Sequence, residues 1–225
     1  MRNILAVALL LLVILSCKKQ DAVIDTTAST PFANVVILGN SITYSPTNSS
    51  LGWTGSWGMA ASTADKDYVH LLTTRFQQIN KSCVVQAHNI AVFETNYDTY
   101  DFDSDLKTYR DSKPDLLILR IGENVQASFD SIAFAKKYQG LIAYMKTNNP
   151  NLKVLAVGSF WSNRDYINVI MSRYTPYISL AVLGTDLSNY AFDRTDWASA
   201  VQQHPGDKGM QGIADMIWAK VQSMK

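Results

Sequence analysis

Four short apolar segments recur along the chain and restrict its fold more than any other feature. Each is a nearly unbroken run of Val, Ile, Leu and Ala, and three of the four are followed directly by glycine. Runs that are apolar at almost every position are typical of strands buried on both faces of a parallel sheet. The segments are residues 35–38, 83–87, 116–121 and 154–157.

Helical patterns separate these segments, with apolar side chains at spacings of three and four. The predicted helices cover residues 68–79, 132–145, 163–174 and 207–221. Residues 178–182 predict a weaker fifth strand, and Asp207 or Gly206 would begin the last helix, with Asp207 as its N-cap. Strands that alternate with helices predict an α/β fold, a three-layer α/β/α sandwich around a central parallel sheet.

The composition fits one globular domain, which we expect to cover residues 32–225. The 225 residues are 47% hydrophobic and 17% charged, so the chain can bury a sizeable core and is not disordered as a whole. There are 20 Lys and Arg against 19 Asp and Glu, without a dense basic run, so nucleic acid is not an expected partner. The presence of only 2 cysteines excludes a disulfide scaffold.

The first 31 residues differ from the rest. Residues 4–15 are an apolar run that is too short to span a bilayer comfortably but has the length of a signal-peptide core. The run ends in Leu-Ser-Cys, which resembles the lipobox of bacterial lipoproteins. That resemblance implies a signal peptide over 1–16, lipidation of Cys17, a flexible tether over 17–31 and a lipid-anchored location in a bacterial cell envelope, at the outer membrane or the periplasmic face. An ordinary secretory signal with an incidental cysteine is the alternative.

Polar residues follow several of the predicted strands, at the edge where ligands bind in open parallel sheets. Asn40 and Ser41 come just after the first strand, and Gly122 and Asn124 come just after the third. His204 lies shortly before the last helix. A serine, a histidine and an amide at one sheet edge are the groups that acyl transfer requires.

Three short motifs contain these residues: Gly39-Asn40-Ser41-Ile42, Gly122-x-Asn124 and His204-Pro205. In this order and at this wide spacing, they resemble the nucleophile, Gly-x-Asn and His-Pro blocks of the SGNH or GDSL-like serine hydrolases. The resemblance covers nearly all of the chain after the leader. It implies a flavodoxin-like fold and carboxylic ester hydrolysis, and serine acyl chemistry requires neither a cofactor nor a metal.

The resemblance also assigns roles to single residues. Ser41 would be the nucleophile, and His204 the general base that takes its proton and returns it to the leaving alcohol. The Ser41 backbone N–H and the Asn124 amide would bind the oxyanion, with Gly122 in the same catalytic block and Asn40 beside it. Each motif taken alone has a structural alternative, since Ser41 could cap a helix and Asn124 could belong to a turn.

Two positions depart from the family pattern. Where the family carries an aspartate three residues before the histidine, this chain has Val201. Either a Ser–His dyad operates, helped by a backbone carbonyl, or Asp193 or Asp196 supplies the orienting acid. Glu94 falls where an oxyanion-binding glycine is expected, and we expect its carboxylate to turn away or to pair with Arg120.

Tryptophans cluster in two predicted loops. Trp53 and Trp57 follow the nucleophile, and Trp161 and Arg164 follow the fourth strand. Aromatic rings stack on the apolar faces of sugars, so these loops predict a carbohydrate-binding cleft, unless Trp53 and Trp57 form a local core instead. The sequence thus favours an esterase that removes acetyl or other short acyl groups from a carbohydrate or another small ester. A glycan-binding lipoprotein without catalysis and an SGNH-type acyltransferase are the alternatives.

Overall fold

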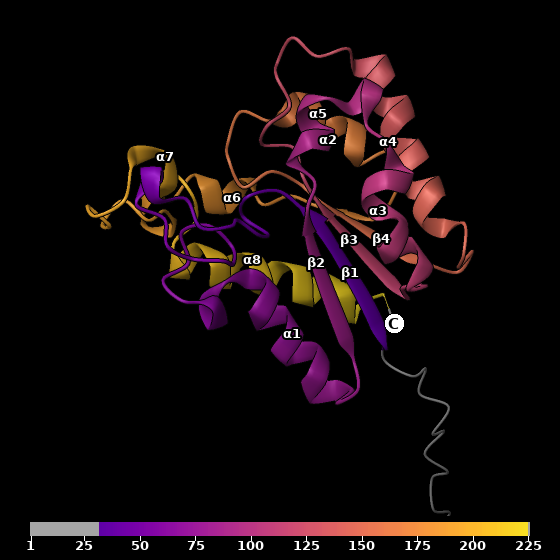
Figure 1. Cartoon of the computed structure of the whole chain (residues 1–225), viewed down its shortest axis with the longest axis horizontal. Coiled ribbons are helices and arrows are strands. Elements are labelled where there is room, and N and C mark those ends of the chain that lie inside the picture. The colour runs from indigo at the N-terminus through magenta and orange to yellow at the C-terminus, as the bar shows by residue number, and fades with distance from the viewer. Residues whose placement is uncertain (1–31, 225) are drawn as a thin grey trace, which may run out of the picture.

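The computed structural model describes residues 32–224, which are organised around one five-stranded parallel sheet (Figure 1). The strands are β1 (Asn34–Gly39), β2 (Val84–Asn89), β3 (Leu116–Arg120), β4 (Lys153–Val157) and β5 (Tyr177–Ile178). Their order in the sheet is β2-β1-β3-β4-β5, and every neighbouring pair is parallel. The chain therefore changes direction across the sheet between β1 and β3, and ligands of such sheets bind outside the carboxyl ends of the strands at that point.

Helices cover both faces of the sheet, as Figure 1 shows. One face carries α1 (Tyr68–Ile79) and α8 (Asp207–Gln222), and the other carries α3 (Phe102–Asp111), α4 (Ser131–Lys146) and α5 (Asp165–Met171). Val35 and Ile37 of β1 belong to the core beneath α1 and α8, whereas Val36 and Leu38 belong to the opposite core. All four side chains are fully buried, which explains why the segment is apolar at every position.

Short helices and 3₁₀ turns occupy the loops between these elements. They are α2 (Ala91–Thr95), α6 (Ala181–Gly184), α7 (Ser199–Gln202), η1 (Ser49–Leu51), η2 (Ala64–Lys66), η3 (Tyr97–Thr99) and η4 (Leu187–Asn189). A third apolar cluster joins the loop after β1 to the segment before α8. Its buried members are Trp53, Met59, Ala60, Ala191, Trp197 and Val201.

The predicted α/β/α sandwich with a central parallel sheet is confirmed. Each of the four apolar segments forms a strand, with limits within two residues of the prediction. The strand predicted over 178–182 is wrong beyond Ile178, because only Tyr177 and Ile178 pair with β4 and the chain enters α6 at Ala181. The helix predicted over 163–174 is the shorter α5.

The cap of one helix differs from the prediction, and another helix was not predicted. Gly206 is the N-cap of α8, and Asp207 is its first helical residue, whose carboxylate instead accepts 2.7 Å hydrogen bonds from the amide and hydroxyl of Ser62. α3 was not predicted, because its apolar stripe is only Phe102, Leu106 and Tyr109, of which Leu106 alone is buried. Asp101 caps this helix through its side chain.

Residues 1–31 lie outside the described part of the chain. The predicted signal peptide over 1–16, the tether over 17–31 and the lipidation of Cys17 fall on those residues. Between residues 32 and 224, no helix is both long and apolar enough to cross a membrane.

Candidate active site

A tight turn after β1 holds Ser41 at the carboxyl edge of the sheet. The Asn40 carbonyl closes the turn by accepting a 2.8 Å hydrogen bond from the amide of Thr43. Gly39 is required where the turn begins, because a Cβ there would lie 1.8 Å from Thr43 Oγ1. Ser41 itself is half-buried, and its hydroxyl faces His204.

His204 and Ser41 form a hydrogen-bonded pair. Nε2 of His204 lies 2.8 Å from Ser41 Oγ, and Nδ1 lies 2.8 Å from the carbonyl oxygen of Ala200 in α7. A carbonyl oxygen only accepts hydrogen bonds, so Nδ1 carries the ring proton and the lone pair of Nε2 faces Ser41. The Ser41 hydroxyl therefore donates to His204, which is the arrangement of a nucleophile and its general base.

Burial controls the charge of His204. The residue is 7% exposed, and the loss of hydration lowers its pKa to about 4, although the hydrogen bond to Ala200 opposes the shift. The imidazole is therefore neutral at physiological pH, and only the neutral ring can accept a proton from Ser41.

Neither of the predicted orienting acids reaches His204. Asp196 forms an ion pair with Arg194, with 2.7 Å between Oδ2 and Nη2, and Asp193 is exposed. The assignment of Asp193 or Asp196 as the acid is wrong, because a backbone carbonyl occupies the acceptor position beside Nδ1. The geometry is that of the other alternative, a Ser–His dyad supported by a carbonyl oxygen.

Two N–H groups after neighbouring strands keep a hydrogen that no described residue accepts. The Ser41 amide donates no hydrogen bond to any residue between 32 and 224. Asn124 follows β3, the neighbour of β1, and its Nδ2 donates one hydrogen to Glu94 Oε2 at 2.6 Å. The second hydrogen of this NH₂ group is not donated to any described residue. Gly122 has a φ of 129°, a conformation that favours glycine, and its amide N–H also donates to Glu94.

Glu94 is buried among these donors, with 1% of its surface exposed. Its Oε1 accepts hydrogen bonds from the amides of Gly122 and Asn124. The predicted pairing of Glu94 with Arg120 is wrong, because the Arg120 guanidinium forms its ion pair with Glu123. Burial, together with the negative charge of Glu123, raises the pKa of Glu94 to about 7.

Asn40 and Glu123 complete this buried polar network. Asn40 Nδ2 donates to Glu123 Oε2 at 2.6 Å and to Glu94 Oε1 at 3.3 Å, and its Oδ1 accepts from Arg120 Nη1 at 3.0 Å. Because both amide hydrogens are used and the side chain is fully buried, Asn40 supports the site from behind and does not face an oxyanion. Sequence reasoning missed Glu123, whose one signal was its place as the middle residue of the Gly-x-Asn block.

The tryptophans after the nucleophile form a core. Trp53 is 1% exposed and packs edge to face with Trp57 and Trp197, at centroid distances of 5.6 and 5.4 Å. The prediction that Trp53 lines a substrate cleft is wrong, and the alternative of a local core is what the structure contains. Trp57 is half-buried at the rim of this core, and its Nε1 donates to the carbonyl of Ala61.

Trp161 and Arg164 line an open hollow of about 510 Å³ beside His204. The Trp161 ring meets the His204 ring edge to face at 5.6 Å, and the Arg164 guanidinium lies 5.9 Å from the Trp161 ring centroid. The hollow is also lined by Leu187, Tyr190, Phe192 and Gln203. Sequence reasoning missed the stacked pair Tyr190 and Phe192, whose signal was two aromatic residues shortly before the His-Pro motif.

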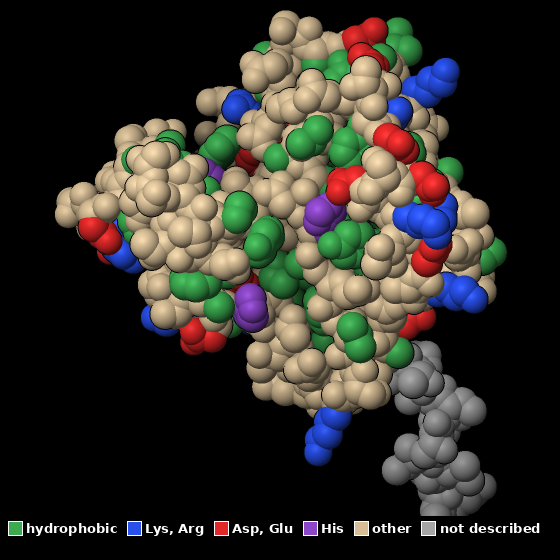
Figure 2. Space-filling model, viewed as in Figure 1, with side chains coloured by type: hydrophobic (Ala, Val, Ile, Leu, Met, Phe, Trp, Pro, Cys, Tyr) green, Lys and Arg blue, Asp and Glu red, His purple; other side chains and the backbone are tan. Residues whose placement is uncertain are grey.

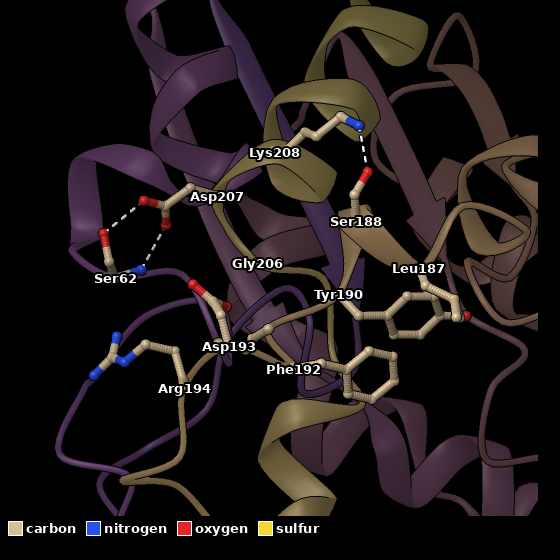
Figure 3. Close-up of a pocket in the computed structure, with 12 residues that line it drawn as sticks. Ser62, Leu187, Ser188, Tyr190, Phe192, Asp193, Arg194, Gly206, Asp207 and Lys208 are labelled. Carbon is tan, nitrogen blue, oxygen red and sulfur yellow. Dashed lines mark hydrogen bonds between the residues drawn. The ribbon is translucent and has the colours of Figure 1, made fainter.

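A second hollow, of about 400 Å³, shares Leu187, Tyr190 and Phe192 with the first (Figure 3). Two of its charged side chains are paired within the protein, since Asp207 binds Ser62 and Lys208 binds Ser188, as the dashed lines in Figure 3 show. Over residues 32–224, no group of three or more His, Cys, Asp or Glu side chains is placed to hold a metal ion.

Solved structures similar to this one identify the fold. A two-domain esterase active on acetylated mannans matches with a TM-score of 0.56 at 19% identity, over 84% of this chain and 48% of that one. A carbohydrate esterase family 2 enzyme of Corynascus thermopiles matches with a TM-score of 0.56 at 13% identity, over 88% and 68% of the two chains. A family 3 carbohydrate esterase of Talaromyces cellulolyticus matches with a TM-score of 0.53 at 17% identity, over 85% and 97%.

The chain has the SGNH-hydrolase fold. The fold implied by the three sequence motifs is thereby confirmed. No protein-family model and no curated protein sequence matches the chain, so the likeness is one of structure. The chain spans about half the length of the mannan esterase, since it covers 48% of that protein. In this SGNH fold, Ser41, Asn124 and His204 come from three separate loops and gather at the carboxyl edge of the sheet.

Proposed function

We propose that this chain is a serine esterase that removes acetyl or other short acyl groups from carbohydrates. The observation that carries the proposal is the 2.8 Å contact between Ser41 Oγ and His204 Nε2 at the carboxyl edge of the sheet. Proteins of the same fold support this chemistry, since one acts on acetylated mannans and another, a family 2 carbohydrate esterase from Clostridium thermocellum, was solved with cellohexaose.

Acylation begins with attack of Ser41 Oγ on the carbonyl carbon of the ester. His204 Nε2 takes the hydroxyl proton as the new C–O bond forms, and the Ala200 carbonyl holds the imidazolium through Nδ1–H. The carbonyl oxygen becomes an oxyanion, which accepts hydrogen bonds from the Ser41 amide and from the second hydrogen of Asn124 Nδ2. The bond to the sugar oxygen then breaks, and His204 returns the proton to that oxygen.

Deacylation repeats the sequence with water as the nucleophile. Water attacks the acyl-Ser41 ester while His204 Nε2 takes one of its protons. Collapse of the second intermediate releases the carboxylic acid and returns the proton to Ser41 Oγ. One ester and one water thus give one alcohol and one acid, and the enzyme is restored.

The hollow beside His204 is the part of the surface that fits a sugar. Trp161 and Phe192 offer aromatic rings, while Arg164 and Gln203 offer hydrogen-bond donors for hydroxyl groups. On the face shown in Figure 2, Lys and Arg side chains are interspersed with Asp and Glu, without an extended area of one sign. Both features favour an uncharged carbohydrate over a strongly charged substrate.

Replacing Phe192 by Ala is expected to raise KM for an acetylated oligosaccharide about 10-fold, the loss of one stacking contact of roughly 1.4 kcal/mol. Phe192 is 43% exposed and stacks on Tyr190, so its removal leaves the Ser41–His204 pair intact. Hydrolysis of a small chromogenic acetyl ester should therefore be unchanged. Trp161→Ala is the companion variant, and because Trp161 contacts His204, it should affect both substrates. Equal KM values for Phe192→Ala and wild type on the oligosaccharide would exclude this hollow as the sugar site.

The proposed activity is tested by measuring acetate released from acetylated mannan and chromophore released from an acetyl ester, with Ser41→Ala as the blank. Release that depends on Ser41 supports the esterase. Acetyl transfer to an added sugar acceptor, in place of acetate release, would identify an acyltransferase. Binding of glycans without any turnover by the folded protein would identify a non-catalytic glycan-binding protein.

We also propose that the domain is held at a bacterial envelope membrane through a lipid on Cys17. The support is the Leu-Ser-Cys sequence at the end of the apolar leader and the polar segment that follows it. A radioactive fatty acid fed to expressing bacteria should label the wild-type chain and not the Cys17→Ser variant. Equal labelling of the two chains would contradict the anchor.

A further inference from the structure

Glu94 is a buried carboxylate whose hydrogen-bond partners are all uncharged N–H groups. It comes from α2, after β2, and reaches past the end of β1 to the turn that follows β3. Oε1 accepts from the amides of Gly122 and Asn124 and from Asn40 Nδ2, the last two at 3.3 Å, and Oε2 accepts from Asn124 Nδ2 at 2.6 Å. Across residues 32–224, no Lys or Arg forms an ion pair with it. Four donors use most of the acceptor capacity of one carboxylate.

These contacts fix the orientation of the Asn124 amide. A carboxylate accepts hydrogen bonds and donates none, so Asn124 must turn Nδ2, and not Oδ1, toward Glu94. The two ends of an asparagine amide have nearly the same shape, so hydrogen-bond partners alone decide between its two orientations. In the flipped orientation, Oδ1 would face a developing oxyanion and repel it.

We propose that Glu94 is a positioning residue, whose carboxylate holds Asn124 with one Nδ2 hydrogen on Glu94 and the other directed to the oxyanion. This inference rests on the proposed esterase function. Glu94 stands near the position where the family pattern has a glycine that donates a backbone N–H, and here it acts instead through Asn124.

This role requires Glu94 to be ionised. The charged groups that face it are Glu123, after β3, and Arg120 of β3, which is paired with Glu123 and joined to the network by Asn40. Burial and the charge of Glu123 raise the pKa of Glu94 to about 7, while the hydrogen bonds from Asn124 oppose the shift. Above that pH the carboxylate accepts from Nδ2. Below it the protonated acid donates to Oδ1 and favours the flipped amide, so kcat should fall as the pH drops through about 7.

His204 does not produce this loss of rate near neutral pH. Burial lowers its pKa to about 4, so the general base stays neutral throughout the range in which Glu94 gains its proton. A fall in kcat centred near pH 7 therefore does not come from His204, and its loss in Glu94→Gln assigns it to Glu94.

The test compares Glu94→Gln, Asn124→Ala and the double variant with the wild-type full chain, on a chromogenic acetyl ester from about pH 5 to about pH 9. Gln has the shape of Glu but carries an NH₂ group, which favours the flipped Asn124 at every pH. We expect Glu94→Gln to lower kcat about 10- to 100-fold at alkaline pH, with KM nearly unchanged and no fall near pH 7. Thermal unfolding checks that each variant is folded.

The double variant separates positioning from a purely structural role. If Glu94 acts through Asn124, the double variant has the kcat of Asn124→Ala, which is expected to lose about 100- to 1000-fold. Asn124→Ala keeps Glu94 but should also lose the fall near pH 7, so the inference is tested even if Glu94→Gln does not fold.

Three results would overturn the role of Glu94: a wild-type kcat that is constant with pH, a fall near pH 7 that persists in Glu94→Gln or Asn124→Ala, or losses that multiply in the double variant. Each of them leaves the esterase intact as long as Ser41→Ala is inactive. Full activity in Ser41→Ala would instead overturn the proposed function itself.

Discussion

Replacing Ser41 by Ala is expected to lower kcat for an acetyl ester by a factor of about 10⁴ to 10⁶. The variant loses the oxygen that attacks the carbonyl carbon, and in residues 32–224 Ser41 is the only hydroxyl hydrogen-bonded to His204 Nε2. His204→Ala should lose a comparable factor, because no other described group accepts the Ser41 proton. Both losses are measured with a chromogenic acetyl ester and confirmed by acetate release from acetylated mannan.

The double variant and an acidic control sharpen this prediction. Ser41→Ala combined with His204→Ala should be no slower than either single variant, since the two side chains act as one unit. Asp196→Asn should keep kcat within about twofold of wild type, because Asp196 is exposed and paired with Arg194. A large loss in Asp196→Asn, or appreciable turnover by purified Ser41→Ala, would contradict a Ser–His dyad.

The sheet could be predicted because strands that are buried on both faces have apolar residues at nearly every position. Val35 to Leu38 alternate between two cores, so every position of β1 must be apolar. The fifth strand has no such apolar run, since β5 lies at the edge of the sheet and pairs only two residues with β4. Its apolar neighbours enter α6, and tertiary contacts, not the local pattern, decide between strand and helix there.

The pairing of Ser41 with His204 could be predicted from the motifs that contain them. Ser41 belongs to the first of the three motifs and His204 to the last, and the fold brings Ser41 Oγ and His204 Nε2 to 2.8 Å from each other. The group that orients His204 could not be assigned to a residue, since it is the backbone carbonyl of Ala200, and every residue type carries a backbone carbonyl. The partners of Glu94 were missed for a related reason, because two of its donors are backbone amides that only the folded turn brings together.

The tryptophans show where residue type fails as a guide. Trp53 and Trp161 both stand among small polar residues, yet one is buried in a core and the other lines an open hollow. The difference arises from the segment before α8, which supplies Trp197 and Val201 to cover Trp53. That segment lies more than a hundred residues away in the chain, beyond the reach of any local pattern.

Trp53→Ala is accordingly expected to destabilise the domain by about 3–5 kcal/mol, the typical cost of removing a buried aromatic side chain. The midpoint of thermal unfolding should fall by about 6 to 20 °C for a domain of this size. Trp161→Ala is the comparison variant, because Trp161 is half-buried at the edge of the core and lines an open hollow, so its removal should cost less stability than that of Trp53. Unfolding followed by circular dichroism measures both.

The same substitution should also slow catalysis through the position of His204. Trp53 packs with Val201, which lies in α7 next to Ala200, the residue whose carbonyl holds Nδ1. Loosening that cluster removes the support of the Ala200 carbonyl. At temperatures well below its unfolding midpoint, Trp53→Ala should therefore have a lower kcat than wild type. Trp53→Phe fills part of the space and should recover stability and kcat together. Recovery of stability without recovery of kcat would show that this cluster does not orient His204. A Trp53→Ala domain as stable as wild type would contradict the core role of Trp53.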